Sequence, residues 1–219
     1  MSQEEIVKKL TQCPKVSQAE PPSLRGTSWT GRVIYVKDAD TLSIARYCPV
    51  SDQLEARTIR ITMIDAPEVP HTRGNKLISE YETMLGFLAK SFVLHKMLPD
   101  QFAVTTDDLY GWRMQKKIFD SHPVLVQVNC PSVDSRGKKI ELDPYSRDLG
   151  SVNVIKQDGC WDIAQSLIAT KLVDAYEGGS KKRSFMTSLA CLDNLGNFTG
   201  ENVLTRVRTA FAQRSSKDL

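Results

Sequence analysis

The sequence has few cysteines, and their spacing does not suit a metal site. Its 219 residues include five cysteines, at positions 13, 48, 130, 160 and 191, and no two of them have the CxxC spacing. The odd count and the wide spacing argue against a zinc site and against a dense disulfide framework. We therefore expect reduced thiols, which are usual in an intracellular compartment.

Long apolar runs are also missing, and the first residues do not resemble a secretory signal. No stretch approaches the roughly 18 apolar residues of a membrane-spanning helix, so we expect no membrane partner. The first ten residues, MSQEEIVKKL, contain early acids and no apolar segment of the kind found in secretory signals. The sequence leaves the compartment open and favours an intracellular one.

A strong excess of one charge is absent as well. The chain has 29 Lys and Arg residues against 26 Asp and Glu residues, a net charge of +3. This balance permits a nucleic-acid partner but does not argue for one, because a basic binding surface depends on how the charges cluster. The three histidines are scattered along the chain, and we expect them at the surface or in the core rather than as ligands.

The chain is long enough for one compact domain with an extension at each end. Residues 1–28 carry three prolines among polar residues and are predicted to form an N-terminal extension with a short helix at 4–10. Residues 29–178 are predicted to form the domain, in which 100–122 is an insertion of mixed local structure. Residues 179–219 are predicted to be a C-terminal helical extension. The sequence shows no internal repeat.

Hydrophobic periodicity predicts strands and helices in a characteristic order. Alternating patterns predict strands at 31–36, 41–46, 58–64, 124–128 and 149–155, with a loop over 47–56. Apolar residues three and four positions apart predict helices at 77–92, 161–170 and 203–211. Three strands, a helix, two strands and a helix are the order of a five-stranded Greek-key OB-fold barrel. The predicted class is therefore α+β, mainly β, with flanking helices.

Two short acidic segments lie where predicted strands meet turns. The first is Asp38-Ala39-Asp40-Thr41, and the second is Asp65-Ala66-Pro67-Glu68. Acids in turns usually have a structural role, because Asp caps turns and tolerates their backbone angles. Together, however, two hard oxygen ligands and a third carboxylate suit Ca²⁺ or Mg²⁺. Neither segment has the spacing of an EF-hand loop, so such a site would be assembled from separate strands.

Basic residues near these acids have two interpretations. Arg60 lies in the third predicted strand and Arg147 in the turn before the fifth. Each alone is typical of a solvated charge or an ion-pair partner, although the planar fork of arginine also suits a phosphate. The run Lys181-Lys182-Arg183 is either a solvated charge cluster or an extension of a nucleic-acid path.

Four segments, in order, resemble the motifs of the staphylococcal nuclease family. VKDADTL at 36–42 is similar to its Asp-Gly-Asp-Thr turn, and RITMIDAPE at 60–68 is similar to its second motif. DPYSR at 143–147 resembles its Asp-Lys-Tyr-Gly-Arg motif, and LVDAY at 172–176 resembles a segment that ends in a substrate-stacking tyrosine. The resemblance spans about residues 29–178. The chain departs from the family pattern at Ala39, Pro144 and Ser146.

The resemblance implies a calcium-dependent endonuclease that cleaves single-stranded DNA or RNA and leaves 3′-phosphate products. The implied ligands of one Ca²⁺ ion are Asp40, Asp65 and the Thr41 carbonyl. Asp38 would orient metal-bound water without binding the ion. The choice of Ca²⁺ comes from the resemblance, since the residue types also allow Mg²⁺.

The resemblance also implies the residues that act on the phosphate and the nucleotide. Arg60 and Arg147 would hold the phosphate, and Glu68 would position or deprotonate the attacking water. Tyr145 and Tyr176 would contact the nucleotide. This division of roles suits the chemistry, because phosphodiester hydrolysis depends mainly on positioning and on stabilising negative charge.

A second hypothesis is a catalytically weak or inactive module that uses the same barrel to bind nucleic acid or protein within a larger complex. A protein partner would contact the C-terminal helix or the 100–122 insertion. The presence of both metal carboxylates, the base and both arginines favours the enzyme.

Overall fold

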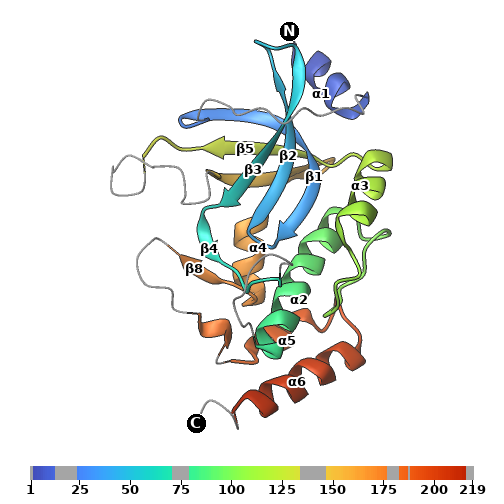
Figure 1. Ribbon diagram of the computed structural model, residues 1–219, viewed down its shortest axis with the longest axis vertical. Coiled ribbons are helices and arrows are strands. Elements are labelled where there is room, and N and C mark those ends of the chain that lie inside the picture. Colours follow the sequence, from blue (N-terminus) through green and yellow to red (C-terminus); the bar gives the residue numbers. More distant parts are fainter. Residues whose placement is uncertain are drawn as a thin grey trace. The chain divides into compact units, whose positions relative to one another are not determined.

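The chain folds as an α+β protein, as predicted from the sequence, although helices cover more of the described residues than strands do. The computed structural model describes residues 2–12, 24–70, 79–133, 147–176, 183–186 and 188–215. Within these ranges it contains a mostly antiparallel six-stranded sheet, a two-stranded sheet and six α-helices (Figure 1). No helix in the described part of the chain has both the length and the apolarity needed to cross a membrane.

The chain divides into two compact units, each built from several segments. The first comprises Met1–Val36, Thr41–Thr62 and Trp112–Ala164, and the second comprises Lys37–Asp40, Met63–Gly111 and Gln165–Leu219. Segments far apart in the sequence therefore share one unit. The division into a central domain and two extensions that we drew from the sequence stays a prediction.

The six-stranded sheet has the strand order β3-β2-β1-β5-β6-β7, and β3 also pairs with β6 in parallel. Its strands are β1 (Thr27–Asp38), β2 (Thr41–Cys48), β3 (Gln53–Ile61), β5 (Leu125–Cys130), β6 (Asp148–Lys156) and β7 (Gly159–Asp162). The remaining pairs with a determined register are antiparallel. Hydrogen bonding thus links strands from both halves of the sequence.

The predicted strands match this sheet, with two differences at β3. The predicted loop over 47–56 is wrong, because β2 and β3 continue into it and the turn is confined to residues 49–52. The predicted strand over 58–64 is interrupted at Thr62, and the chain resumes at Met63 with a φ of 69°. This left-handed residue changes the direction of the backbone, which separates β3 from the next strand.

Two helices accompany the sheet in the first unit. They are α1 (Gln3–Gln12) and α3 (Trp112–Ser121), and α3 lies inside the predicted insertion. The Gln115 amide of α3 accepts a hydrogen bond from the Val36 nitrogen at 2.8 Å and donates one to the Val36 oxygen at 3.1 Å. A buried glutamine replaces an apolar residue on the inner face of α3, so hydrophobic periodicity did not reveal this helix.

The second unit is mainly helical. Its long helix α2 (Glu80–Met97) begins after Ser79, whose hydroxyl accepts a hydrogen bond from the Glu82 nitrogen. The C-terminal helix α6 (Glu201–Ser215) packs on α2, and the Tyr81 and Phe211 rings meet edge to face with centroids 5.2 Å apart. The predicted stripe on α6 is confirmed by the burial of its apolar residues Leu204, Val207 and Ala210.

Short elements complete the description. The helix predicted over 161–170 begins later, as α4 (Ile163–Thr170), because residue 161 belongs to β7. The helix α5 (Ala190–Leu195) precedes α6, and the three-residue strand β4 (Met63–Asp65) pairs antiparallel with β8 (Asp174–Tyr176). Strands of three residues carry no readable periodicity, so the β4–β8 ribbon could not be predicted.

Candidate active site

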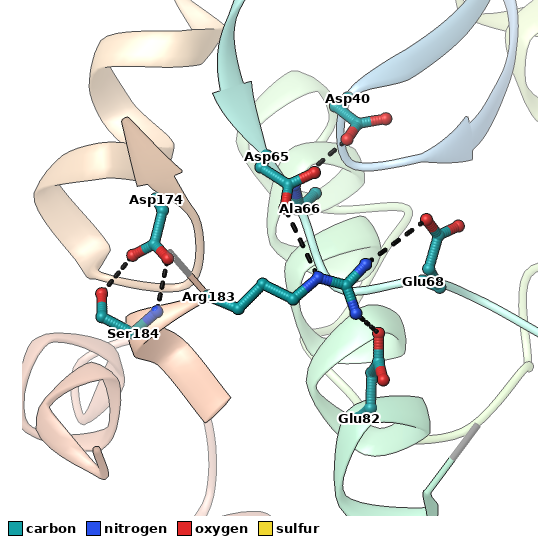
Figure 2. A network of polar contacts seen from close by, with 8 residues as sticks. All are labelled: Asp40, Asp65, Ala66, Glu68, Glu82, Asp174, Arg183 and Ser184. Atoms are coloured by element: carbon teal, nitrogen blue, oxygen red, sulfur yellow. Dashed lines mark hydrogen bonds and ion pairs between the residues drawn. The ribbon is translucent and has the colours of Figure 1, made fainter. Parts of the chain in front are cut away.

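The two acidic turns of the sequence lie together in the second unit. The Asp40 carboxylate accepts a hydrogen bond from the Ala66 nitrogen at 3.1 Å (Figure 2). This bond joins the turn after β1 to the residue that follows β4. Asp40 and Asp65 are both buried, with 7% and 1% of their surfaces exposed. The fold therefore places the Asp40 carboxylate against the backbone of the residue that follows Asp65.

Arg183 lies among the carboxylates of this site. Its Nε is 3.6 Å from Asp65 Oδ2, and its Nη2 is 3.8 Å from Glu68 Oε1 (Figure 2). Its Nη1 donates a hydrogen bond of 3.0 Å to Glu82 Oε1. We call the four acids Asp40, Asp65, Glu68 and Glu82 the acidic cluster.

Ser184, the residue after Arg183, is hydrogen-bonded to the β4–β8 ribbon that contains Asp65. The Ser184 nitrogen and hydroxyl both donate to the Asp174 carboxylate (Figure 2). Asp174 lies opposite Asp65 in the β4–β8 register. Like charges opposite each other destabilise a ribbon, so the donors from Ser184 and the guanidinium of Arg183 offset this repulsion.

Sequence reasoning missed Arg183 and Glu82 as members of the site. Arg183 was read within a basic run whose two lysines, 181 and 182, lie outside the described residues. Glu82 completes the Ser-x-x-Glu pattern of a helix start, which by itself indicates a cap. Neither position carries a local signal of its long-range partner, so only the fold reveals the contact.

Asp38 lies at the end of β1 in the electrostatic field of a buried lysine. Its own surface is 6% exposed, and that of Lys90 on α2 is 4% exposed. Burial lowers the pKa of the Lys90 ammonium, and the negative charges of Asp108 and Asp38 act in the opposite direction. Asp108 is the ion-pair partner of Lys90, at 3.5 Å. The role of Asp38 in orienting water stays a prediction.

The carboxylates of the acidic cluster have the donor chemistry of a Ca²⁺ or Mg²⁺ site, since both ions take oxygen ligands. Over the ranges described above, however, no group of three or more His, Cys, Asp or Glu side chains is arranged to hold a metal ion. The cluster instead contains a cation of its own, the Arg183 guanidinium. The oxygen donors fit a cation in kind, and in this structure the cation beside them is the Arg183 guanidinium.

In the first unit, the two arginines predicted to bind the phosphate both lie next to Thr41. Arg147 Nη1 donates a hydrogen bond of 3.0 Å to the Thr41 hydroxyl. Arg60 lies opposite Thr41 in the β2–β3 register, and its Nη1 donates to the Ile61 oxygen at 3.1 Å. Residues from three strands or strand ends, β2, β3 and β6, therefore meet at Thr41.

Of the two tyrosines predicted to contact the nucleotide, Tyr176 belongs to the described residues and Tyr145 does not. Tyr176 is half-buried in β8, opposite Met63 of β4. Tyr145 lies outside the described residues, as do Pro144 and Ser146, where the chain departs from the family pattern. Their roles stay predictions.

Alanine is accommodated where the resembling motif has glycine. The described non-glycine residues with positive φ are Asp52, Met63, Lys171 and Arg183. Ala39 is not one of them, and its side chain is fully buried. The acidic turn of 38–41 therefore forms without left-handed strain at this position.

Gly86 of α2 passes against the backbone of Glu68. A Cβ added at this glycine would lie 2.5 Å from the Glu68 oxygen and 2.9 Å from its carbonyl carbon. We expect Gly86→Ala to lower the free energy of unfolding by about 1–3 kcal/mol, because backbone atoms would have to shift. Without this clash, Gly→Ala in a helix interior normally stabilises a protein by about 0.5–1 kcal/mol, so a loss of stability would reveal the close contact. Urea unfolding measures the change.

Gly111 is the matched control, because a Cβ added there meets nothing within 4 Å. Gly111→Ala should leave the free energy of unfolding close to that of the wild type. If Gly86→Ala were as stable as the wild type, the close approach of α2 to Glu68 would be wrong.

No protein-family model matches the chain, and no match was found among curated proteins. The resemblance to the staphylococcal nuclease family therefore rests on the motif residues themselves.

Proposed function

We propose that this protein is a metal-dependent nuclease that hydrolyses phosphodiester bonds in single-stranded DNA or RNA. The observation that carries the proposal is the acidic cluster of the second unit. Its members Asp40, Asp65 and Glu68 were selected from the sequence for this chemistry. Asp65 and Glu68 both pair with Arg183, and Asp40 accepts a hydrogen bond from the nitrogen of Ala66, the residue after Asp65. An arrangement of turn acids with purely local roles would not require these long-range contacts.

We propose in addition that the first unit is an OB-fold barrel. The neighbours run from β1 to β2, β3, β6 and β5, and then back to β1. This return to the starting strand supports closure of a five-stranded barrel, with β7 added to β6 as a hairpin. A barrel of this kind suits a single-strand binding protein, because it reads backbone and stacked bases rather than sequence.

Asp40 and Asp65 would hold the divalent ion, together with the Thr41 carbonyl. The ion, when bound, would act as a Lewis acid that stabilises negative charge on the phosphate. The resemblance favours Ca²⁺, and the hard oxygen donors also allow Mg²⁺.

The chain's own residues would carry the other parts of the reaction. Arg60 and Arg147 would bind the phosphate oxygens with the paired N–H donors of their planar guanidinium groups. Glu68, more exposed than Asp65, would accept a proton from water. The bond from the water oxygen to phosphorus forms, the bond from phosphorus to the 5′-oxygen breaks, and that oxygen takes up a proton. The products are a 3′-phosphate and a 5′-hydroxyl.

The test of the proposed function is cleavage of end-labelled single-stranded DNA and RNA in Ca²⁺, in Mg²⁺ and in chelator. We expect cleavage with a divalent ion and none with chelator. The products should carry a 3′-terminal phosphate that a phosphatase removes. The binding-module hypothesis predicts the opposite result, namely strands that are bound but remain intact in every condition.

A further inference from the structure

The proposed reaction uses neither Arg183 nor its ion-pair partner Glu82. The Arg183 side chain is 25% exposed and lies within ion-pair distance of three carboxylates. Two of these, Asp65 and Glu68, are the proposed metal ligand and the proposed base. The third, Glu82, is buried and makes the shortest of the three contacts.

We propose that Arg183 is the resident counter-ion of the acidic cluster and that a divalent cation binds Asp65 only in exchange for its guanidinium. Arg183 would thus set the affinity of the site for metal. The inference rests on the proposed function, because it assumes that Asp65 is a metal ligand.

The distances explain why both cations do not share Asp65. A Ca²⁺ ion lies about 2.3–2.6 Å from its carboxylate ligands. Nε of Arg183 is already 3.6 Å from Asp65 Oδ2, so a bound ion would lie within a few ångströms of the guanidinium. The repulsion of +1 and +2 charges about 5 Å apart weakens binding about tenfold, even at the dielectric constant of water. Partial burial increases this effect.

The fold also provides a place for the guanidinium after the exchange. The hydrogen bond from Nη1 to Glu82 is independent of Asp65 and is shorter than the two contacts to Asp65 and Glu68. Arg183 has a φ of 49°, a left-handed conformation that is unfavourable for a side chain with a Cβ. Its contacts with the carboxylates therefore hold a strained residue, and loss of some of them releases it.

The test is the affinity for Ca²⁺, measured by calorimetry on the wild type, Arg183→Gln, Arg183→Lys and Arg206→Gln. We expect Arg183→Gln to bind Ca²⁺ at least about tenfold more tightly. Arg183→Lys, which keeps the charge, should stay within about threefold of the wild type. Arg206 is the matched control, because it pairs with Asp107 and not with the acidic cluster, and its variant should bind Ca²⁺ as the wild type does.

The outcomes separate this inference from the proposed function. If all four proteins bind Ca²⁺ with the same affinity, the exchange is refuted and the metal site stands. If Arg183→Lys tightens binding as much as Arg183→Gln does, space rather than charge controls the site and the exchange is also refuted. If none of them binds Ca²⁺ or Mg²⁺, the proposed metal site fails together with the inference.

A measurement on the wild type, for which Arg183→Lys serves only to assign the signal, covers the case in which Arg183→Gln does not fold. The side-chain Nε–Hε signal of Arg183 in a nitrogen–proton spectrum, assigned by its loss in Arg183→Lys, reports on the guanidinium directly. Exchange predicts that saturating Ca²⁺ shifts this signal. Binding of Ca²⁺ with an unchanged signal would overturn the proposal.

Discussion

Replacement of Arg147 by alanine is expected to lower kcat by about 10²–10³-fold and to change KM much less. The reason is that a preorganised donor acts mainly where charge develops in the transition state, and loss of one such donor has this magnitude. In the structure the Arg147 guanidinium is oriented by its hydrogen bond to the Thr41 hydroxyl. Steady-state cleavage of a labelled single strand gives both constants.

The fold and the charge change have to be separated from this effect. The hydrogen bond to Thr41 contributes about 0.5–1.5 kcal/mol of stability, which thermal unfolding of the variant will detect. Arg206→Ala removes an arginine of equal charge whose partner is Asp107. It should leave kcat unchanged. Turnover at the wild-type rate in Arg147→Ala would show that this arginine does not bind the reacting phosphate.

Asp65→Asn is expected to abolish the response of the protein to divalent ions. The change preserves the shape of a side chain that is 2% exposed, but it removes the charge that a hard cation requires. At a Ca²⁺ concentration 100 times its dissociation constant, the wild type should gain about 2.7 kcal/mol of stability. The variant should gain none, and its cleavage rate should fall by at least about 10²-fold. Thermal unfolding with and without Ca²⁺ measures the first effect.

The matched control for this variant is Asp193→Asn, an exposed acid on α5. It should retain the full stabilisation by Ca²⁺. A Ca²⁺-induced stabilisation of Asp65→Asn equal to that of the wild type would place the ion elsewhere and remove Asp65 from the site.

Much of the sheet could be predicted because its strands alternate. Leu42 and Ile59 face each other in the β2–β3 register and are fully buried, as the period of two requires. The turn between these strands was overestimated because Pro49 and its polar neighbours suggested a longer loop. The helix α3 was missed for the opposite reason, since its inner face uses the polar Gln115 to bond a strand backbone.

The acids of the candidate site could be selected from the sequence because their motifs are short and continuous. Their arrangement in the second unit could not be predicted, because the hydrogen bond between Asp40 and Ala66 joins segments that follow different strands. The position of Arg183 was beyond sequence reasoning altogether. It depends on the β4–β8 ribbon, on Asp174 and on a left-handed residue, none of which leaves a periodic pattern.

The most direct test of the proposed nuclease site is the single-turnover cleavage rate of single-stranded DNA in Ca²⁺ for the wild type, Glu68→Gln and Glu201→Gln. Glu201 is the control, because its side chain is 73% exposed and pairs with Arg208 on α6. We expect cleavage by the wild type and Glu201→Gln at equal rates, and a rate at least about 10²-fold lower for Glu68→Gln. Equal rates for all three proteins, or no cleavage by any of them, would contradict the proposed site.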